Sequence, residues 1–273
     1  MSEEPQDGTA PFIPQDPAMF DEVAALTLRV ARPLIWHDRT EGWPKVLDGA
    51  TCFFLRFEER VIGVTANHVV DIFAEAKAGN PNLVCQLRSS PAFDLLGNII
   101  ARDPGRDIAT FAVSEAVLAS TEAIALDCRG RWPPPTPERL RALSVCGFPE
   151  SMRTAAADKS AEFAAWGALP AVESITEREI LITYEPTRDR PSRWAPILPP
   201  VGFNLSGCSG GPVLMHALVG GLHRWFPVAL IGAGPKEGST GQSSEFDMIR
   251  LKRIHVIRPD GTIESEAGGW LPK

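Results

Sequence analysis

Cysteine is scarce in this chain of 273 residues, which holds five cysteines far apart in the sequence. Their number is odd and no two of them form a Cys-x-x-Cys pair, so the sequence argues against a disulfide framework and against a zinc site. We expect free thiols, most of them buried, and we expect neither a metal nor another cofactor. The cysteines are Cys52, Cys85, Cys128, Cys146 and Cys208.

The chain also has no apolar run long enough to cross a bilayer and no run of Lys or Arg. The first absence argues against a transmembrane helix. The second, together with a formal net charge of −7, argues against binding to nucleic acid or to an anionic membrane. The first 17 residues lack the basic start and the apolar segment of a secretory signal. We therefore expect a cytoplasmic protein with no nucleic-acid partner and no membrane partner.

Short segments rich in β-branched and aromatic residues, separated by turn residues, are abundant and predict strands. Few segments have the length and period of a crossover helix. Residues 69–78 are an exception, because their apolar residues recur at helical spacing and Gly79 follows them. The expected strands are 23–30, 50–57, 61–65, 83–88 and 108–113 in the first half, and 140–146, 180–184, 212–215 and 228–231 in the second.

Prolines concentrate between these two groups of strands and predict a semi-rigid linker, since proline is excluded from helix and strand interiors. Two β-rich halves joined in this way favour two packed β-barrels. The expected organisation is a flexible acidic, Pro-rich arm (1–20), an N-terminal barrel (21–127), the linker (128–139) and a C-terminal barrel (140–273).

Three motifs carry residues suited to nucleophilic catalysis. In VIGVTANHVV a strand ends in small residues and His68 opens a helix, and in RDIATFAV Asp107 stands at the start of an alternating strand. In GCSGGPVL, glycines surround Ser209. A serine hydroxyl needs a base within hydrogen-bond reach, and a histidine oriented by a carboxylate is such a base.

Together these motifs resemble those of the trypsin/chymotrypsin-like serine peptidases, which carry a small-small-His turn, an Asp-(Ile/Leu)-Ala strand start and a Gly-x-Ser-Gly-Gly-Pro loop in this order. The resemblance implies an all-β fold of two packed antiparallel six-stranded β-barrels with few short helices. It implies a serine endopeptidase that forms an acyl-enzyme on Ser209, with His68 as the base and Asp107 as its orienting carboxylate. It places the oxyanion hole at the backbone N–H groups of Gly207 and Ser209.

The same resemblance implies a substrate site. Gly232, Ala233 and Gly234 lie in the segment that resembles the substrate-pairing strand, and Phe203 lies at the base of the side-chain pocket. A phenyl ring at the base favours small apolar side chains before the scissile bond. The partners implied are a peptide or protein substrate and a partner protein that supplies it.

The chain departs from the family at Cys208, where Asp is usual, at Asn67, where a small residue is commoner, and at Gly232, where Ser is common. These departures leave open a catalytically weak or inactive peptidase-like binding module. Asp107 could instead cap its own turn, a role that we expect for Asp103. Ser209 could simply occupy a tight turn.

A second alternative is an esterase of the α/β-hydrolase type, because residues 207–211 also fit the G-x-S-x-G nucleophile elbow. Asp247 and His255 follow in the order that this fold requires. However, a helix must follow the elbow, and Pro212-Val-Leu-Met is a poor helix start.

Overall fold

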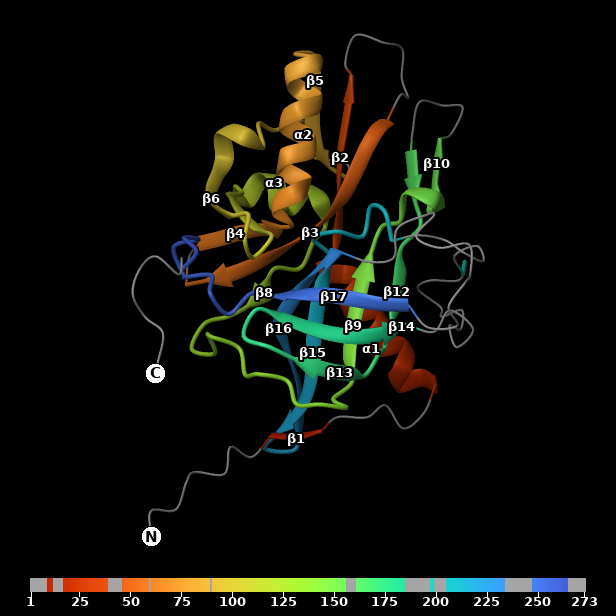
Figure 1. Ribbon diagram of the computed structural model, residues 1–273, viewed down its shortest axis with the longest axis vertical. Coiled ribbons are helices and arrows are strands. Elements are labelled where there is room, and N and C mark those ends of the chain that lie inside the picture. Colours follow the sequence, from red (N-terminus) through yellow and green to blue (C-terminus); the bar gives the residue numbers. More distant parts are fainter. Residues whose placement is uncertain are drawn as a thin grey trace.

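The described part of the chain is mainly antiparallel β-sheet with three short α-helices, as expected from the sequence (Figure 1). No helix among the described residues is both long and apolar enough to cross a membrane. The computed structural model describes residues 9–11, 17–38, 46–58, 60–88, 90–155, 161–184, 197–198, 205–233 and 247–264.

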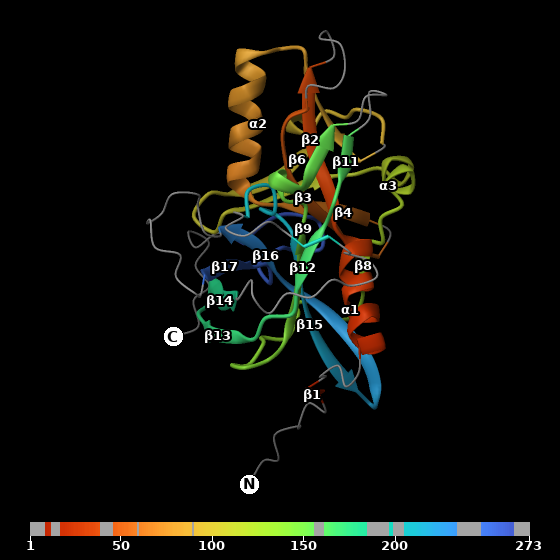
Figure 2. The same ribbon diagram turned by 90° about the vertical axis from the view of Figure 1, so that its right-hand side faces the viewer.

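The first sheet has the strand order β5-β2-β3-β4-β7-β6, with β8 added in parallel to β3. Helix α2 (Asn67–Gly79) contains the helix predicted at residues 69–78. Figure 2 shows α2 and α3 (Glu115–Thr121) on opposite sides of the first sheet. The strands are β2 (Arg32–Asp38), β3 (Val46–Phe57), β4 (Arg60–Thr65), β5 (Leu83–Leu87), β6 (Ile99–Asp103), β7 (Ile108–Ala112) and β8 (Leu126–Asp127); a 3-10 turn spans Leu96–Asn98.

The second sheet has the order β12-β9-β15-β16-β17-β14-β13, and β1 pairs with β15. It closes on itself, because Val172 exchanges backbone hydrogen bonds with Leu140 (2.8 Å) and Arg141 (3.0 Å) just before β9. The strands are β1 (Thr9–Pro11), β9 (Leu143–Gly147), β12 (Trp166–Ala168), β13 (Val172–Ile175), β14 (Glu179–Tyr184), β15 (Pro212–Val219), β16 (Leu222–Ala233) and β17 (Asp247–Arg253); β10 (Arg153–Ala155) and β11 (Ala161–Phe163) form a separate ribbon after a 3-10 turn at Glu150–Met152.

Each sheet encloses its own apolar cluster. Phe53 and Phe111 belong to the cluster of the first sheet, and Trp166 and Leu251 belong to that of the second. The buried residues of 254–257, which the sequence-based division assigned to the C-terminal barrel, pack in the first cluster. The chain therefore returns to the first sheet after β17.

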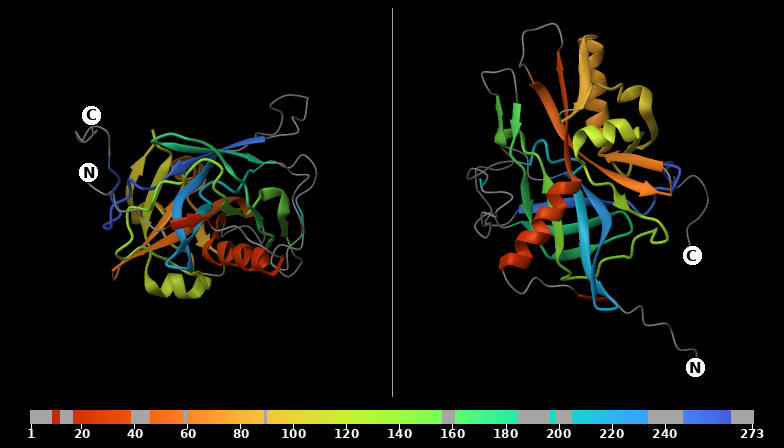
Figure 3. Two further views of the ribbon diagram at one scale, coloured as in Figure 1. Left: turned by 90° about the horizontal axis from the view of Figure 1, so that it is seen from below. Right: turned by 180° about the vertical axis from the view of Figure 1, so that it is seen from behind.

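The strand expected at 23–30 is wrong, because these residues form the end of α1 (Pro17–Val30). Val23, Thr27 and Val30 are buried, and their spacing of four and three residues places them on one helix face. This burial outweighs the strand propensity of the β-branched residues. Helix α1 packs on β9, β12 and β15 (Figure 3). Each of the other expected strands coincides at least in part with a strand of the structure.

Part of the arm predicted to be flexible belongs to the fold, since Thr9–Pro11 pairs with β15 and α1 begins at Pro17. The linker, residues 128–139, forms neither helix nor strand, as its prolines predict. Trp132 in the linker meets Phe57 edge-on and donates a hydrogen bond to Ile257 O (2.6 Å).

A chain of buried polar groups joins α1 to the second sheet. Thr27 Oγ1 lies 2.8 Å from Ser144 Oγ, which in turn lies 2.6 Å from His216 Nε2. His216 Nδ1 lies 2.9 Å from His223 Nε2. Burial, with a smaller contribution from the neighbouring His223, lowers the pKa of His216 to about 3. His216 is therefore neutral in the folded protein near neutral pH.

The contact between Gly63 and Phe111 generates a prediction about stability. The two residues pair across β4 and β7, and a Cβ at Gly63 would overlap the Phe111 ring. Gly63→Ala should therefore lower the free energy of unfolding by about 1–3 kcal/mol, measured by urea denaturation. Gly79→Ala is the control, because its Cβ would meet no heavy atom within 4 Å. Equal stability of the two variants would contradict this packing.

The burial of His216 generates a prediction about pH. Between the ordinary histidine pKa of 6.5 and the folded value of about 3, the unfolded chain binds a proton at His216 that the folded chain does not. The free energy of unfolding should therefore fall as pH is lowered through this window, by up to about 1.4 kcal/mol per pH unit from this group. Urea denaturation should show a shallower pH dependence in His216→Gln. Identical slopes in both proteins would count against a neutral, buried imidazole.

Candidate active site

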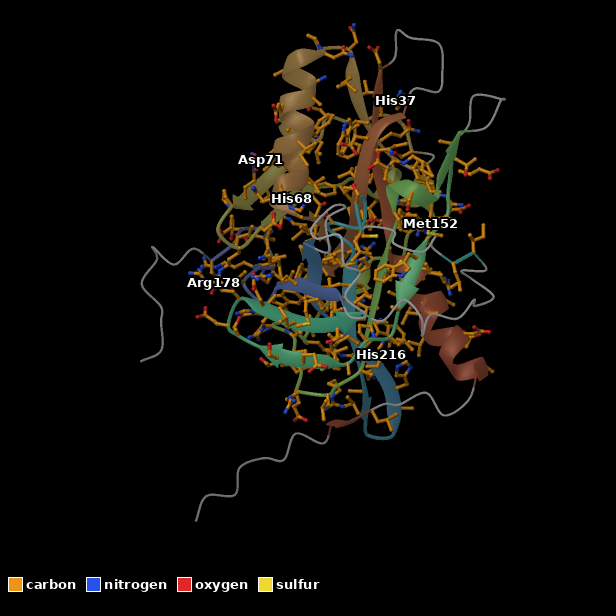
Figure 4. The ribbon with its side chains drawn as sticks, turned by 45° about the vertical axis from the view of Figure 1, so that its right-hand side comes forward. His37, His68, Asp71, Met152, Arg178 and His216 are labelled. Atoms are coloured by element: carbon orange, nitrogen blue, oxygen red, sulfur yellow. The ribbon has the colours of Figure 1, made fainter. Side chains whose placement is uncertain are left out.

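His68 and Asp107 meet at the junction of α2 and β7. His68 lies in the first turn of α2 and Asp107 directly precedes β7. The His68 Nδ1 atom lies 3.0 and 2.9 Å from the two carboxylate oxygens, and the His68 backbone N–H donates to Oδ1 at 3.0 Å. The His68 side chain remains 40% exposed, and the Asp107 side chain 18%. A carboxylate that engages Nδ1 leaves Nε2 as the ring atom able to accept a proton. Figure 4 shows His68 at the end of α2 that faces the second sheet.

The backbone at Asp107 is in the left-handed region, with φ of 57°. This conformation is uncommon for a residue other than glycine and carries a cost that the surrounding structure must offset. Asp103 Oδ1 accepts the Arg106 N–H at 3.0 Å, so Asp103 caps the turn as expected from the sequence. The Asp107 carboxylate is thereby available to His68.

A polar cluster that the sequence did not reveal supports this pair. Asn67 Nδ2 donates to Asp71 Oδ2 (2.8 Å), and Arg102 Nε donates to Asn67 Oδ1 (2.8 Å). Arg102 also pairs with Asp71. Arg102 lies on β6, one residue before the turn that carries Asp107, so the cluster ties the start of α2 to that turn. The i, i+4 spacing of Asn67 and Asp71 was the available signal, but Arg102 is distant in sequence.

Ser209 lies in a tight loop, residues 205–211, which we call the Ser209 loop. Gly207 and Gly210 have φ values of 87° and 84°, where only glycine is unstrained. A Cβ at Gly210 would overlap Thr51 O and Thr65 Oγ1, atoms of the first sheet. Glycine is therefore required for this loop of the second sheet to pack against the first.

The Ser209 loop is adjacent to the segment that leads into His68. Thr51 N–H donates to Ser209 O at 3.0 Å, and a Cβ added at Gly210 would lie 3.0 Å from Ala66 N. Among the described residues, the Ser209 hydroxyl makes its hydrogen bond with Gly232 O (3.3 Å) and not with the His68 ring. The structure thus places Ser209 beside the first sheet with its hydroxyl turned toward β16.

The backbone N–H groups of residues 207–211 fall into two sets. Those of Cys208, Gly210 and Gly211 donate to backbone carbonyls at 2.9, 2.7 and 2.9 Å. Within the described part of the chain, those of Gly207 and Ser209 have no acceptor. These are the two donors that the sequence assigned to an oxyanion hole, and that assignment stays a prediction.

Cys208 has a packing role. It is fully buried against Gly147, where an added Cβ would lie 2.7 Å from the Cys208 sulfur. Burial raises the pKa of this thiol well above its usual value, so it stays protonated and unreactive. All five cysteines are free and buried, as the sequence predicts.

The expected substrate-binding residues are only partly described. The space that a Gly232 side chain would occupy is filled by the methylenes of Lys252, 2.6 Å from a Cβ built there. Ala233 ends β16. Phe203 and Gly234 lie outside the described residues, so the pocket expected there stays a prediction.

The hydrogen-bonded pair of Ser144 and His216 is a second meeting of serine and histidine. It could not be found from the sequence because the two residues lie on neighbouring strands, β9 and β15, and only the strand register brings them together. Ser144 is 1% exposed and His216 is 2% exposed. Substrate therefore cannot reach this pair without a rearrangement of α1 and the second sheet.

The esterase alternative is wrong. Pro212 begins strand β15 directly after the Ser209 loop, where a nucleophile elbow would be followed by a helix. The surrounding fold is antiparallel β-sheet and, over the described residues, lacks the alternation of strands and helices that an α/β-hydrolase requires.

Among known proteins, solved structures with a similar fold are found. No family model matches this chain, and no curated protein matches it. It is similar to the solved structure of the Rv3671c protease from M. tuberculosis in its active form, with 16% identity, a TM-score of 0.45, and coverage of 92% of this chain and 87% of that one. It is also similar to the HtrA-type protease AlgW with a tripeptide, with 14% identity, a TM-score of 0.41, and coverage of 85% and 59%. At these values the similarity to the two proteases carries no conclusion about what this chain does.

Proposed function

We propose that the protein is a serine endopeptidase that hydrolyses peptide bonds through Ser209, His68 and Asp107. The observation that carries the proposal is the imidazole of His68, which is held at Nδ1 by the Asp107 carboxylate and remains partly exposed. The approach of the Ser209 loop to the segment before His68 supports it. Cys208 is excluded as the nucleophile by its burial.

In the proposed reaction, rotation of the Ser209 side chain takes its hydroxyl from Gly232 O to His68 Nε2. His68 accepts the hydroxyl proton as Oγ attacks the peptide carbonyl, and Asp107 stabilises the imidazolium. The carbonyl oxygen becomes an oxyanion, which accepts hydrogen bonds from the N–H groups of Gly207 and Ser209. His68 then gives its proton to the leaving amine, and water hydrolyses the acyl-enzyme by the same steps.

The proposed substrate is an extended peptide or protein segment with a small apolar side chain before the scissile bond, which a partner protein supplies. This preference depends on Phe203, Ala233 and Gly234 as lining residues. The five free thiols fit a reducing compartment, and we propose a cytoplasmic location.

A peptidase-like binding module without turnover is the second candidate. The hydrogen bond from Ser209 to Gly232 O favours it, since a hydroxyl held there does not share its proton with His68. The two candidates differ in whether the Ser209 hydroxyl can be activated at all.

A fluorophosphonate probe distinguishes the candidates, because it reacts with an activated serine. The wild-type protein should be labelled, and Ser209→Ala should not be labelled while its thermal unfolding is unchanged. Ser144→Ala is the matched control and should still react, because Ser144 is buried. Asp107→Asn and His68→Ala should slow labelling by about 10²–10⁴-fold, the usual contribution of a general base.

Mass spectrometry of the labelled protein identifies the modified residue. Persistent labelling of Ser209→Ala would show that another residue reacts. A folded wild-type protein that does not react at all would support the binding module.

A further inference from the structure

A single buried residue of the first sheet, Thr51 on β3, makes three hydrogen bonds to the second half of the chain, two of them to the Ser209 loop. Its N–H donates to Ser209 O (3.0 Å), and its hydroxyl donates to Gly207 O (2.8 Å). The same hydroxyl accepts the Phe148 N–H at 3.0 Å. Thr51 is fully buried, so water does not compete for these bonds.

The hydroxyl of Thr51 has a fixed orientation. Its proton is committed to Gly207 O, and one lone pair is committed to the Phe148 N–H. The Thr51 carbonyl accepts the Thr65 hydroxyl at 2.9 Å, which holds Thr51 in its own sheet. The residue therefore links the first sheet to the Ser209 loop and to the segment that follows β9.

These bonds fix the carbonyls of the Ser209 loop. Gly207 O and Ser209 O accept from Thr51, Ser206 O accepts from Glu150 N (2.8 Å), and Cys208 O accepts from Gly211 N (2.9 Å). The orientation of a carbonyl fixes the N–H of the same peptide unit, which belongs to the next residue. Thr51 therefore holds the peptides that carry the Cys208 and Gly210 N–H groups, and the peptide that carries the Ser209 N–H lies between these two. Gly207, at a φ of 87°, has no side chain to restrict rotation of the loop backbone.

We propose that Thr51 is a positioning residue for the candidate active site: its hydroxyl holds the Gly207–Cys208 peptide, which lies between the peptides that carry the Gly207 and Ser209 N–H groups, and so limits rotation of both donors away from an oxyanion. The inference rests on the proposed function, because an oxyanion forms only if Ser209 attacks a carbonyl. Thr51 itself touches no reacting atom.

Thr51→Val tests the proposal, since valine keeps the branched shape and removes the hydroxyl. Thr51→Ser is the rescue variant, because serine can make both side-chain hydrogen bonds. Thr110→Val is the matched control. Thr110 is also fully buried in the first sheet, but its hydroxyl donates to Gly261 O (2.6 Å) and not to the Ser209 loop.

Two readouts separate positioning from stability. Amide hydrogen exchange at Phe148 and Gly211 measures the order of the loop and needs no catalysis. In Thr51→Val these amides should exchange at least about 10-fold faster than in Thr110→Val, because without the Thr51 hydroxyl the loop opens locally more often. The second readout is the fluorophosphonate labelling rate of Ser209, with kcat and KM on a peptide substrate.

Labelling and kcat should fall by about 10-fold or more in Thr51→Val with KM little changed, because displaced oxyanion donors act on the transition state. Thr51→Ser should restore both readouts, and Thr110→Val should leave labelling unchanged. Should Thr51→Val fail to fold, Thr51→Cys replaces it, because cysteine has the shape of serine with a weaker donor; labelling and kcat should then be lower, and exchange faster, than in Thr51→Ser.

Unchanged exchange at both amides in Thr51→Val would overturn the proposal. Faster exchange with unchanged labelling would also overturn it, because the loop would then be loosened without effect on the site. If the folded wild type does not react with the probe, the proposed function fails, and exchange alone decides whether Thr51 orders the loop.

Discussion

The packing of the Ser209 loop against strand β3 of the first sheet is the constraint on which the site depends. Gly210 can lie there only without a side chain, and Thr51 uses both its backbone and its hydroxyl to hold the loop. The loop belongs to the second sheet, whereas His68 and Asp107 belong to the first. A shift between the sheets would change the distance between Ser209 and His68, so the proposed site requires this contact to be stable.

The first sheet contributes a histidine whose orientation is determined from two sides. Asp107 engages both the ring and the backbone of His68, and the cluster of Asn67, Asp71 and Arg102 fixes the start of α2. Asp107 itself adopts an unfavourable backbone conformation. Backbone strain persists where surrounding contacts hold it in place. At Asp107 it brings the carboxylate within hydrogen-bond distance of the His68 ring.

Features encoded in a few consecutive residues were predictable from the sequence, and features created by strand register were not. The small-small-His turn, the Asp103 cap and the glycines around Ser209 are local, so composition and order were enough to locate them. The roles of Thr51 and Arg102 depend on partners far along the chain. Helix α1 was misjudged because β-branched residues favour strands, although its buried positions follow the helical period.

The central claim is that the Ser209 loop and His68 form one site across the two sheets. A crystal structure of the protein after reaction with a phosphonate tests it most directly. We expect phosphorus bonded to Ser209 Oγ, with a phosphonyl oxygen about 2.7–3.1 Å from the N–H groups of Gly207 and Ser209. His68 Nε2 should lie within hydrogen-bond distance of the adduct. An adduct on another residue, or a phosphonyl oxygen turned away from both N–H groups, would contradict the claim.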